Sequence, residues 1–163
     1  MEKFQIFVHT GFELIDAVIN IKLNYAREKE IEVFCHISAD FSPFETEDIV
    51  SLFSNAIDNA TEASLKCSRR CISILIQNKR NYLCMTIGNA IENSVLAQNG
   101  KLLTTKQDKQ FHGFGRQSML NIVQKYDGMM EYYENNGMFF VDILLKNTKQ
   151  ERKTTKQEKS VDF

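Results

Sequence analysis

The sequence contains few residues that interrupt a folded chain, and it has no long apolar stretch. One proline and seven glycines among 163 residues exclude collagen-like and proline-rich chains. No apolar run approaches the ~20 residues that a membrane-spanning helix needs, and the run Cys71–Ile76 is already interrupted by Ser73. The N-terminus has no long apolar segment followed by small residues, so we expect no secretory signal and a cytoplasmic location.

Neither the net charge nor the cysteines point to a partner. Twenty Lys and Arg nearly balance 21 Asp and Glu, and a net charge of −1 creates no field that attracts nucleic acid or a membrane surface. Cys67 and Cys71 are spaced C-x3-C, but no second pair or nearby histidine completes a zinc site. We therefore expect reduced thiols, no structural metal and no nucleic-acid partner.

What the chain does have is the composition of an ordinary globular protein. Hydrophobic residues make up 43% and charged residues 25%, which argues against wholesale disorder. The length predicts one domain that buries a full core without disulfides or metals. We expect this domain over residues 12–146, preceded by a lead-in over 1–11 and followed by a mobile basic tail over 147–163.

Hydrophobic periodicity predicts three helices. The first covers residues 12–28, with its apolar face formed by Leu14, Val18, Ile21 and Tyr25. The run Ser42-Pro43-Phe44-Glu45 has the form of a capping box with proline at the first helical position, and Thr46 is a second possible cap. Both predict a helix that continues to about Ala63. The third helix follows Gly115 and ends near Gly128.

Alternating apolar residues predict five strands, over 31–38, 72–76, 83–87, 129–134 and 138–145. The order is α-β-α-β-β-loop-α-β-β, and hairpins dominate. This order predicts an α+β fold, a two-layer α/β sandwich with a mostly antiparallel mixed sheet covered on one face by about three helices. The polar stretch 89–113 is longer than loops in compact domains usually are, which predicts a lid or binding loop.

Polar residues in three places are candidates for a site. Asn55, Asn59 and Glu62 stand at i, i+4 and i+7, so they gather on one flank of the second helix. Asparagine is a poor residue inside a helix, which suggests a role here, although a solvated flank is the simpler explanation of the spacing alone. Asn89, near the end of a strand, either projects into a pocket at the sheet rim or belongs to a turn.

The third candidate is the run His112-Gly113-Phe114-Gly115, which directly precedes a helix. Paired glycines let the backbone approach a ligand closely, and the N–H groups at a helix N-terminus suit phosphate. A plain turn is the alternative interpretation. Lys106, in the long loop, offers a further phosphate contact or is simply solvated.

In their order and context these runs resemble the Bergerat-fold (GHKL) ATPases, the superfamily of gyrase, MutL and the sensor histidine kinases. Residues 55–63 resemble the N box, and 112–118 are similar to the second glycine box, especially to its version in peptide-pheromone and quorum-sensing sensor kinases. The lead-in over 14–22 is also similar to the segment that enters the ATP-binding domain in that subgroup. The resemblance spans 12–146.

The resemblance implies a role for each candidate. Asn59 would coordinate the Mg²⁺ that bridges the ATP phosphates, and Asn55 would orient or activate the attacking group. Asn89 falls where the usual Asp-x-Gly-x-Gly box places the Asp that reads the adenine amino group. The remaining members of the implied ATP-binding set are Glu62 on the helix flank, Lys106 in the lid, and the phosphate cradle of His112, Gly113, Phe114 and Gly115.

The sequence departs from the family pattern in three places. Asn89 replaces the expected Asp, and no glycines follow it. Arg116 replaces the aliphatic residue that usually follows the second glycine. Neither His9 nor His36 lies in a motif that resembles a phosphoacceptor helix.

The resemblance thus implies the catalytic domain of a bacterial two-component sensor histidine kinase, which transfers the γ-phosphoryl group of ATP to a histidine. Its partners would be a separate histidine-containing dimerisation domain and a response regulator, within a membrane-anchored homodimeric kinase. We expect no autophosphorylation of this chain alone. Two alternatives stay open: an anti-sigma-type serine kinase, against which the missing box counts, and a non-catalytic nucleotide-binding interaction module.

Overall fold

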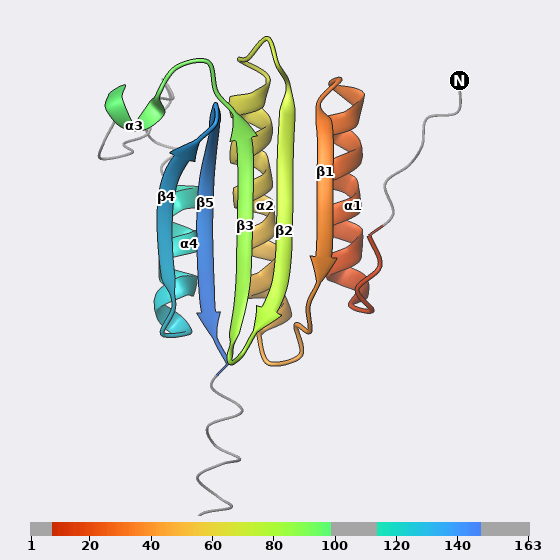
Figure 1. Cartoon of the computed structure of the whole chain (residues 1–163). Coiled ribbons are helices and arrows are strands. Elements are labelled where there is room, and N and C mark those ends of the chain that lie inside the picture. Colours follow the sequence, from red (N-terminus) through yellow and green to blue (C-terminus); the bar gives the residue numbers. More distant parts are fainter. Residues whose placement is uncertain (1–7, 99–113, 148–163) are drawn as a thin grey trace, which may run out of the picture.

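The computed structural model describes residues 8–98 and 114–147. Within these ranges the chain forms nine elements (Figure 1): α1 (Glu13–Glu28), β1 (Glu32–Ser38), α2 (Thr46–Ser64), β2 (Cys71–Lys79), β3 (Tyr82–Ala90), α3 (Val95–Gln98), α4 (Phe114–Lys125), β4 (Met129–Asn135) and β5 (Met138–Lys146). The predicted order is confirmed, with the short α3 as an addition. No helix in the described ranges is both long enough and apolar enough to cross a membrane.

The strands form one mixed sheet in the order β1-β2-β3-β5-β4. β1 pairs with β2 in parallel, and every other pair is antiparallel. α1, α2 and α4 lie against one face of this sheet, and the other face is open among the described residues (Figure 1). The predicted α+β sandwich is confirmed.

The core lies between the sheet and the three longer helices. Alternate residues of β2 and β3 point into it, namely Ile72, Ile74, Ile76, Leu83, Met85 and Ile87, and all are at most 3% exposed. The predicted apolar stripe of α2 packs against them and is buried from Ile49 to Ala60. Each such side chain stabilises the fold by about 1.5–3 kcal/mol relative to exposure, which makes this layer the main source of stability.

The predicted core face of α1 is wrong. The buried residues are Ile15, Ile19 and Leu23, whereas Ile21 is 69% exposed, and Leu14 and Tyr25 are also exposed. Two apolar sets at helical spacing share this helix, and periodicity alone does not say which one meets the sheet. Asp16 lies beside the buried set and is itself buried. Its carboxylate tolerates this because it accepts a hydrogen bond from Thr10 N–H at 2.9 Å.

The predicted capping box at Ser42 is also wrong, since α2 begins at Thr46. The Ser42 hydroxyl bonds to Asp40 instead, at 2.9 Å. The start of α2 is held by Tyr126, whose Oη accepts from Glu45 N–H at 2.9 Å and donates to Asp48 Oδ2 at 2.7 Å. Burial, together with the bond to Asp48, raises the pKa of Tyr126. Tyr126, which follows α4 directly, therefore caps the N-terminus of α2, a role that a neighbouring side chain has in most helices.

The prediction of a lid or binding loop over 89–113 is wrong for its first part, and 99–113 lie outside the described residues. β3 continues to Ala90, and Ile91 N–H donates to Gly137 O at 2.9 Å. Glu134 Oε1 on β4 then accepts from Val95 N–H (2.7 Å) and Leu96 N–H (2.9 Å) at the start of α3. The segment 91–98 is therefore attached to the β4–β5 hairpin.

We predict that this attachment weakens in acid. Hydrogen bonds from Leu96 N–H, the Ser94 side chain and Val95 N–H lower the pKa of Glu134 below its usual 4.5. A lowered folded-state pKa stabilises the fold above pH 4.5, and that stabilisation is lost as the pH falls through the lowered value. Protection of the Val95 and Leu96 amides in hydrogen exchange should fall about two- to fivefold, which corresponds to about 0.5–1 kcal/mol after solvent screening.

The control for this experiment is a second glutamate on the same strand. Glu134→Gln should lower the protection at neutral pH and remove most of its acid dependence. Glu131→Gln should change neither, since Glu131 points to the opposite face of the sheet. Acid-independent protection in the unmodified chain would contradict the assignment.

Candidate functional site

Polar residues form a continuous stripe along α2. Asp48, Ser51, Asn55, Asn59 and Glu62 succeed one another at steps of three or four residues, which keeps them on one flank of the helix at about 100° per residue. Asn55 is half-buried, and Asn59 and Glu62 are exposed. The three predicted residues thus share one flank.

The N-terminal part of this stripe, from Asp48 to Asn55, is covered by α4. Ser51 Oγ and Ser118 Oγ form a hydrogen bond of 3.2 Å, and Asn55 Nδ2 donates to Ser51 O at 2.8 Å. A Cβ placed on Gly115 would lie 2.8 Å from Asn55 Oδ1. A side chain at position 115 would therefore displace the Asn55 amide, which shows that the two motifs identified in the sequence are in contact.

The pairing of α2 with α4 fixes where the rest of the stripe lies. Asn55 meets Gly115 and Ser51 meets Ser118, so the two helices run antiparallel. Asn59 and Glu62, one and two turns further along α2, therefore lie beyond the first turn of α4. The N–H groups of that turn have no helical partner and attract anions.

The predicted phosphate cradle is only partly within the described residues. Phe114, the first residue of α4, is 68% exposed, and Gly115 follows it against Asn55. Lys106, His112 and Gly113 lie outside the described residues.

Asn89 lies on the helix-covered face of the sheet, at the end of β3 against which α2 packs. It is 5% exposed and is flanked by Ile72 and Phe139 on the neighbouring strands. Its Nδ2 donates to Ala90 O at 3.0 Å, and no group in the described part of the chain donates to its Oδ1. The buried amide therefore presents a carbonyl acceptor.

Arg116 joins α4 to the sheet. Its guanidinium lies 5.7 Å from the centre of the Tyr132 ring on β4, and Tyr132 stacks on Phe139. Burial raises the pKa of Tyr132, and Arg116 partly offsets this. The arginine that departs from the family pattern thus packs on an aromatic side chain.

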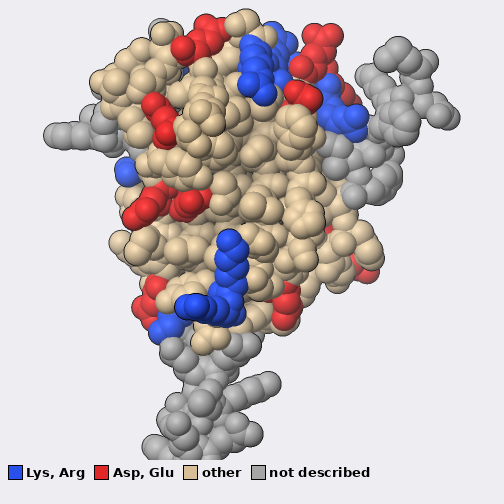
Figure 2. Space-filling model, viewed as in Figure 1, with Lys and Arg blue, Asp and Glu red and all other residues tan. Residues whose placement is uncertain are grey.

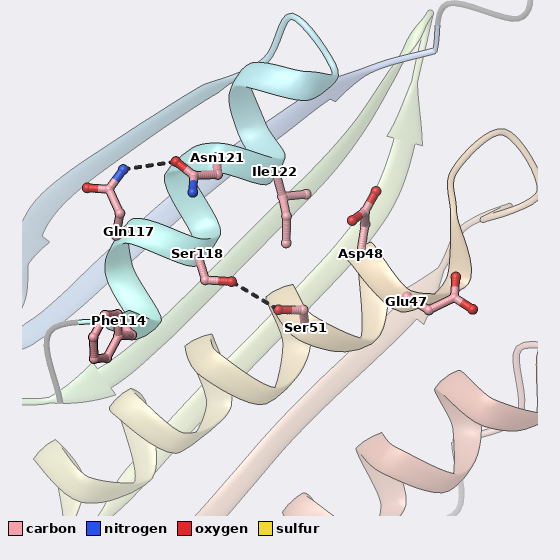
Figure 3. Close-up of a pocket in the computed structure, with 8 residues that line it drawn as sticks. All are labelled: Glu47, Asp48, Ser51, Phe114, Gln117, Ser118, Asn121 and Ile122. Atoms are coloured by element: carbon pink, nitrogen blue, oxygen red, sulfur yellow. Dashed lines mark hydrogen bonds between the residues drawn. The ribbon is translucent and has the colours of Figure 1, made fainter. Parts of the chain in front are cut away.

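A cleft of about 370 Å³ lies between the first half of α2 and α4 (Figure 3). Its lining residues are Glu47, Asp48, Ser51, Phe114, Gln117, Ser118, Asn121 and Ile122. Of the predicted site residues only Phe114 lines it, because the cleft extends from the start of α4 away from Asn59. The Asp48 carboxylate is already paired with Lys125 at 2.6 Å and bonded to Tyr126.

The described residues contain no cluster of three His, Cys, Asp or Glu side chains able to hold a metal. A divalent cation would here depend on single oxygen ligands such as Asn59 Oδ1, supplemented by ligand oxygens and water, which is how Mg²⁺ is often held.

Sequence reasoning missed two parts of this arrangement. Ser51 and Asp48 continue the Asn55 spacing backwards at i−4 and i−7, so the same periodicity would have identified them. The contact of Arg116 with Tyr132 joins residues from separate elements and leaves no local signal.

Comparisons with known proteins identify the family and the fold of the chain. The family profile described as GHKL domain matches residues 44–146. Among solved structures, the nucleotide-free catalytic domain of histidine kinase ThkA is similar at 17% identity and a TM-score of 0.62, with 87% of this chain and 96% of that chain covered. A second ThkA form gives 15% identity and a TM-score of 0.61, over 87% and 96% of the two chains.

The Acinetobacter baumannii histidine kinase AdeS is similar at 14% identity and a TM-score of 0.54, over 81% of this chain and 64% of that one. No curated protein sequence matches the chain. At these identities the structural matches establish the shared fold.

Proposed function

The chain belongs to the GHKL domain family, and from that premise we propose that it is the ATP-binding catalytic domain of a sensor histidine kinase, extending over about residues 12–146. The observation that carries the proposal is the contact between Gly115 and Asn55. It brings the glycine-containing start of α4 against the asparagine stripe of α2, which creates one place where phosphates and a cation could be held together. We further propose that the kinase is of the peptide-pheromone or quorum-sensing type, which is supported by the similarity of residues 112–118 to the glycine box of that subgroup.

The residues present fit an adenine nucleotide. The Oδ1 of Asn89 is a nearly buried acceptor, which suits the amino group of adenine, and it replaces the carboxylate of the usual family box. The first turn of α4 offers N–H donors to phosphate oxygens, and Gly115 keeps that turn close to α2. Lys106, His112 and Gly113 complete the proposed phosphate contacts, and Glu62 belongs to the same flank as Asn59.

The residues also fit Mg²⁺ bound through a nucleotide. Asn59 is exposed beyond the start of α4 and supplies a neutral oxygen ligand, and phosphate oxygens and water would supply the others. When bound, MgATP provides the γ-phosphoryl group for transfer. Asn55, held by its bond to Ser51 O, would orient the attacking group, and the α4 N-terminus would stabilise charge on the transferred group.

The acceptor would be a histidine on a separate dimerisation domain, from which a response regulator would receive the phosphoryl group. The chain itself is expected to carry no acceptor, since neither His9 nor His36 lies in a recognisable acceptor motif. A nucleotide-binding module without catalysis is the second candidate, favoured by the loss of the carboxylate at Asn89 and by the packing of Arg116 on Tyr132.

Two measurements test the proposal. Titration calorimetry should detect MgATP binding at millimolar nucleotide or below, and its absence would overturn the proposal. Radiolabelled ATP should then phosphorylate a supplied histidine-bearing helical domain, with acid-labile product, whereas the chain alone should stay unlabelled. Binding without any transfer to that domain would favour the non-catalytic module.

We predict that Gly115→Ala weakens MgATP binding about tenfold with little loss of stability. The new Cβ would lie 2.8 Å from Asn55 Oδ1, and this side-chain oxygen can move away, so the fold survives. Alanine also favours the helix over glycine by about 1 kcal/mol. The cost should therefore appear in binding, measured by calorimetry.

The Asn55→Ala background provides the control. If Gly115→Ala acts by displacing Asn55, it should cost little further affinity when Asn55 is already absent, since contacting residues are not additive. Additive losses in the double variant would contradict this explanation.

A further inference from the structure

The open face of the sheet, opposite the helices, carries a large set of apolar side chains. Phe34 is 52% exposed, Met129 is 54% exposed, and Leu75 and Tyr133 are about 40% exposed. Phe140 stacks on Tyr133 with ring centres 5.0 Å apart and covers Gly88. Figure 2 shows uncharged side chains over the middle of this face, with acidic groups toward the β4 side and basic side chains over its lower part.

The strand register arranges this face in rows across the sheet. One row is uncharged and rich in aromatic residues: Phe34, Ser73, Gly88, Phe140 and Tyr133 from β1 to β4. The next row is His36, Leu75, Thr86, Asp142 and Glu131. Its acidic residues are confined to β5 and β4, and its histidine is on β1.

We propose that this face binds a second copy of the chain, with the two sheets packed face to face around a two-fold axis parallel to β3. β3 is the central strand of the sheet, so such an axis covers every strand and sets β1 of each copy over β4 of the other. The face measures about 24 Å by 23 Å from strand spacing and rise, roughly 550 Å² in projection. That is of the order of the ~800 Å² of accessible surface that a standard interface buries per partner.

Within the row of His36 and Glu131, charge favours an axis parallel to β3, whereas at the far end of the sheet the same axis sets Lys79 on β2 opposite Lys146 on β5, a like-charge pair that opposes association. An axis parallel to β3 sets His36 of one copy opposite Glu131 of the other, and the imidazole can donate to the carboxylate whether or not it is protonated. Phe34 then lies opposite Tyr133. An axis perpendicular to the strands at this row would instead set Glu131 and Asp142 opposite their own copies, which like charges disfavour.

Packed sheets cross at ~30°, so β3 is inclined by about 15° to the two-fold axis, and the edge strands are offset by about 5 Å, which a glutamate side chain can span. Asp142 would lie opposite Leu75, but it keeps a hydrogen bond from Thr86 Oγ1 at 2.6 Å within its own sheet. This contact opposes association, so Asp142→Asn should tighten the dimer.

Sedimentation equilibrium on the full chain, from about 1 μM to about 1 mM, tests the proposal. The average mass should rise from the 18.9 kDa of one chain toward twice that value. Leu75→Lys should return it to the monomer. Ile21→Lys is the matched control, because Ile21 is an exposed apolar residue on the opposite layer and its replacement should change nothing.

A charge exchange tests the axis itself. His36→Glu should weaken association about tenfold by setting two carboxylates opposite each other, twice per dimer. Adding Glu131→Lys should restore it. A monomer throughout the concentration range, a dimer broken by Ile21→Lys and not by Leu75→Lys, or failure of the double variant to regain association would each overturn the proposal. Circular dichroism shows whether each variant is folded.

Discussion

Asn59→Ala is expected to remove nearly all of the thermal stabilisation that MgATP gives this chain. At a nucleotide concentration 100 times the dissociation constant, binding stabilises the fold by ~2.7 kcal/mol, or about 5–10 °C in melting temperature. If loss of the amide ligand weakens binding about 100-fold, the same concentration leaves only about 0.4 kcal/mol and a shift near 1 °C. Thermal unfolding with and without MgATP measures this.

The variant should otherwise fold normally, because Asn59 is exposed and exposed substitutions usually change stability by no more than about 0.5 kcal/mol. Gln124→Ala is the control: it removes an exposed helical amide from the last turn of α4, away from the stripe. An unchanged MgATP shift in Asn59→Ala would show that the cation is held elsewhere.

Gly128→Ala is expected to destabilise the fold by about 4 kcal/mol or more, the largest effect of any single substitution considered. A Cβ at this position would lie 2.1 Å from Leu144 O and 3.0 Å from Val123 O. Both are backbone atoms, and Leu144 pairs with Met129 in the β4–β5 ladder, so neither can move without breaking the sheet or the end of α4. Such a loss is a large part of the 5–15 kcal/mol that stabilises a typical domain.

Gly137→Ala is the matched control for that substitution. Gly137 has a φ of 72° in the β4–β5 turn, but its nearest neighbour is 4.0 Å from the added Cβ. Gly137→Ala should therefore lower the free energy of unfolding by only about 1–2 kcal/mol, which is the cost of a left-handed conformation for alanine. Urea unfolding of both variants measures the difference, and equal losses would refute the steric explanation.

The sequence predicted the parts of the fold that depend on local periodicity. The apolar stripe of α2 and the alternation in β2 and β3 are strong because each element has one apolar face. The buried face of α1 was predicted wrongly because this helix carries two apolar sets. Asp16 lies beside the set that is buried, and its carboxylate is hydrogen-bonded by Thr10, which precedes the helix. The first residue of α2 was predicted wrongly because the side chain that caps this helix, Tyr126, is distant in the sequence.

The site shows the same division. The spacing of Asn55, Asn59 and Glu62 placed them on one flank, and the helix after the glycines was expected. That Gly115 meets Asn55 follows from the antiparallel pairing of α2 with α4, which no local pattern specifies. The roles of Asn59 and Asn89 stay predictions until nucleotide binding is measured.

The sheet register has a consequence for how this domain can diversify. β3 and β5 are neighbours, and residues 91–98 are attached to the β4–β5 hairpin by Ile91 and Glu134, so the chain on either side of 99–113 is held by the sheet and by α4. The entropy of closing a loop grows only with the logarithm of its length, and doubling the length costs about 0.6 kcal/mol. Because the sheet and α4 fix both flanking ends, the stability of the described fold should depend little on the number of residues between positions 98 and 114, and length variation there would act on the proposed nucleotide binding and not on the scaffold.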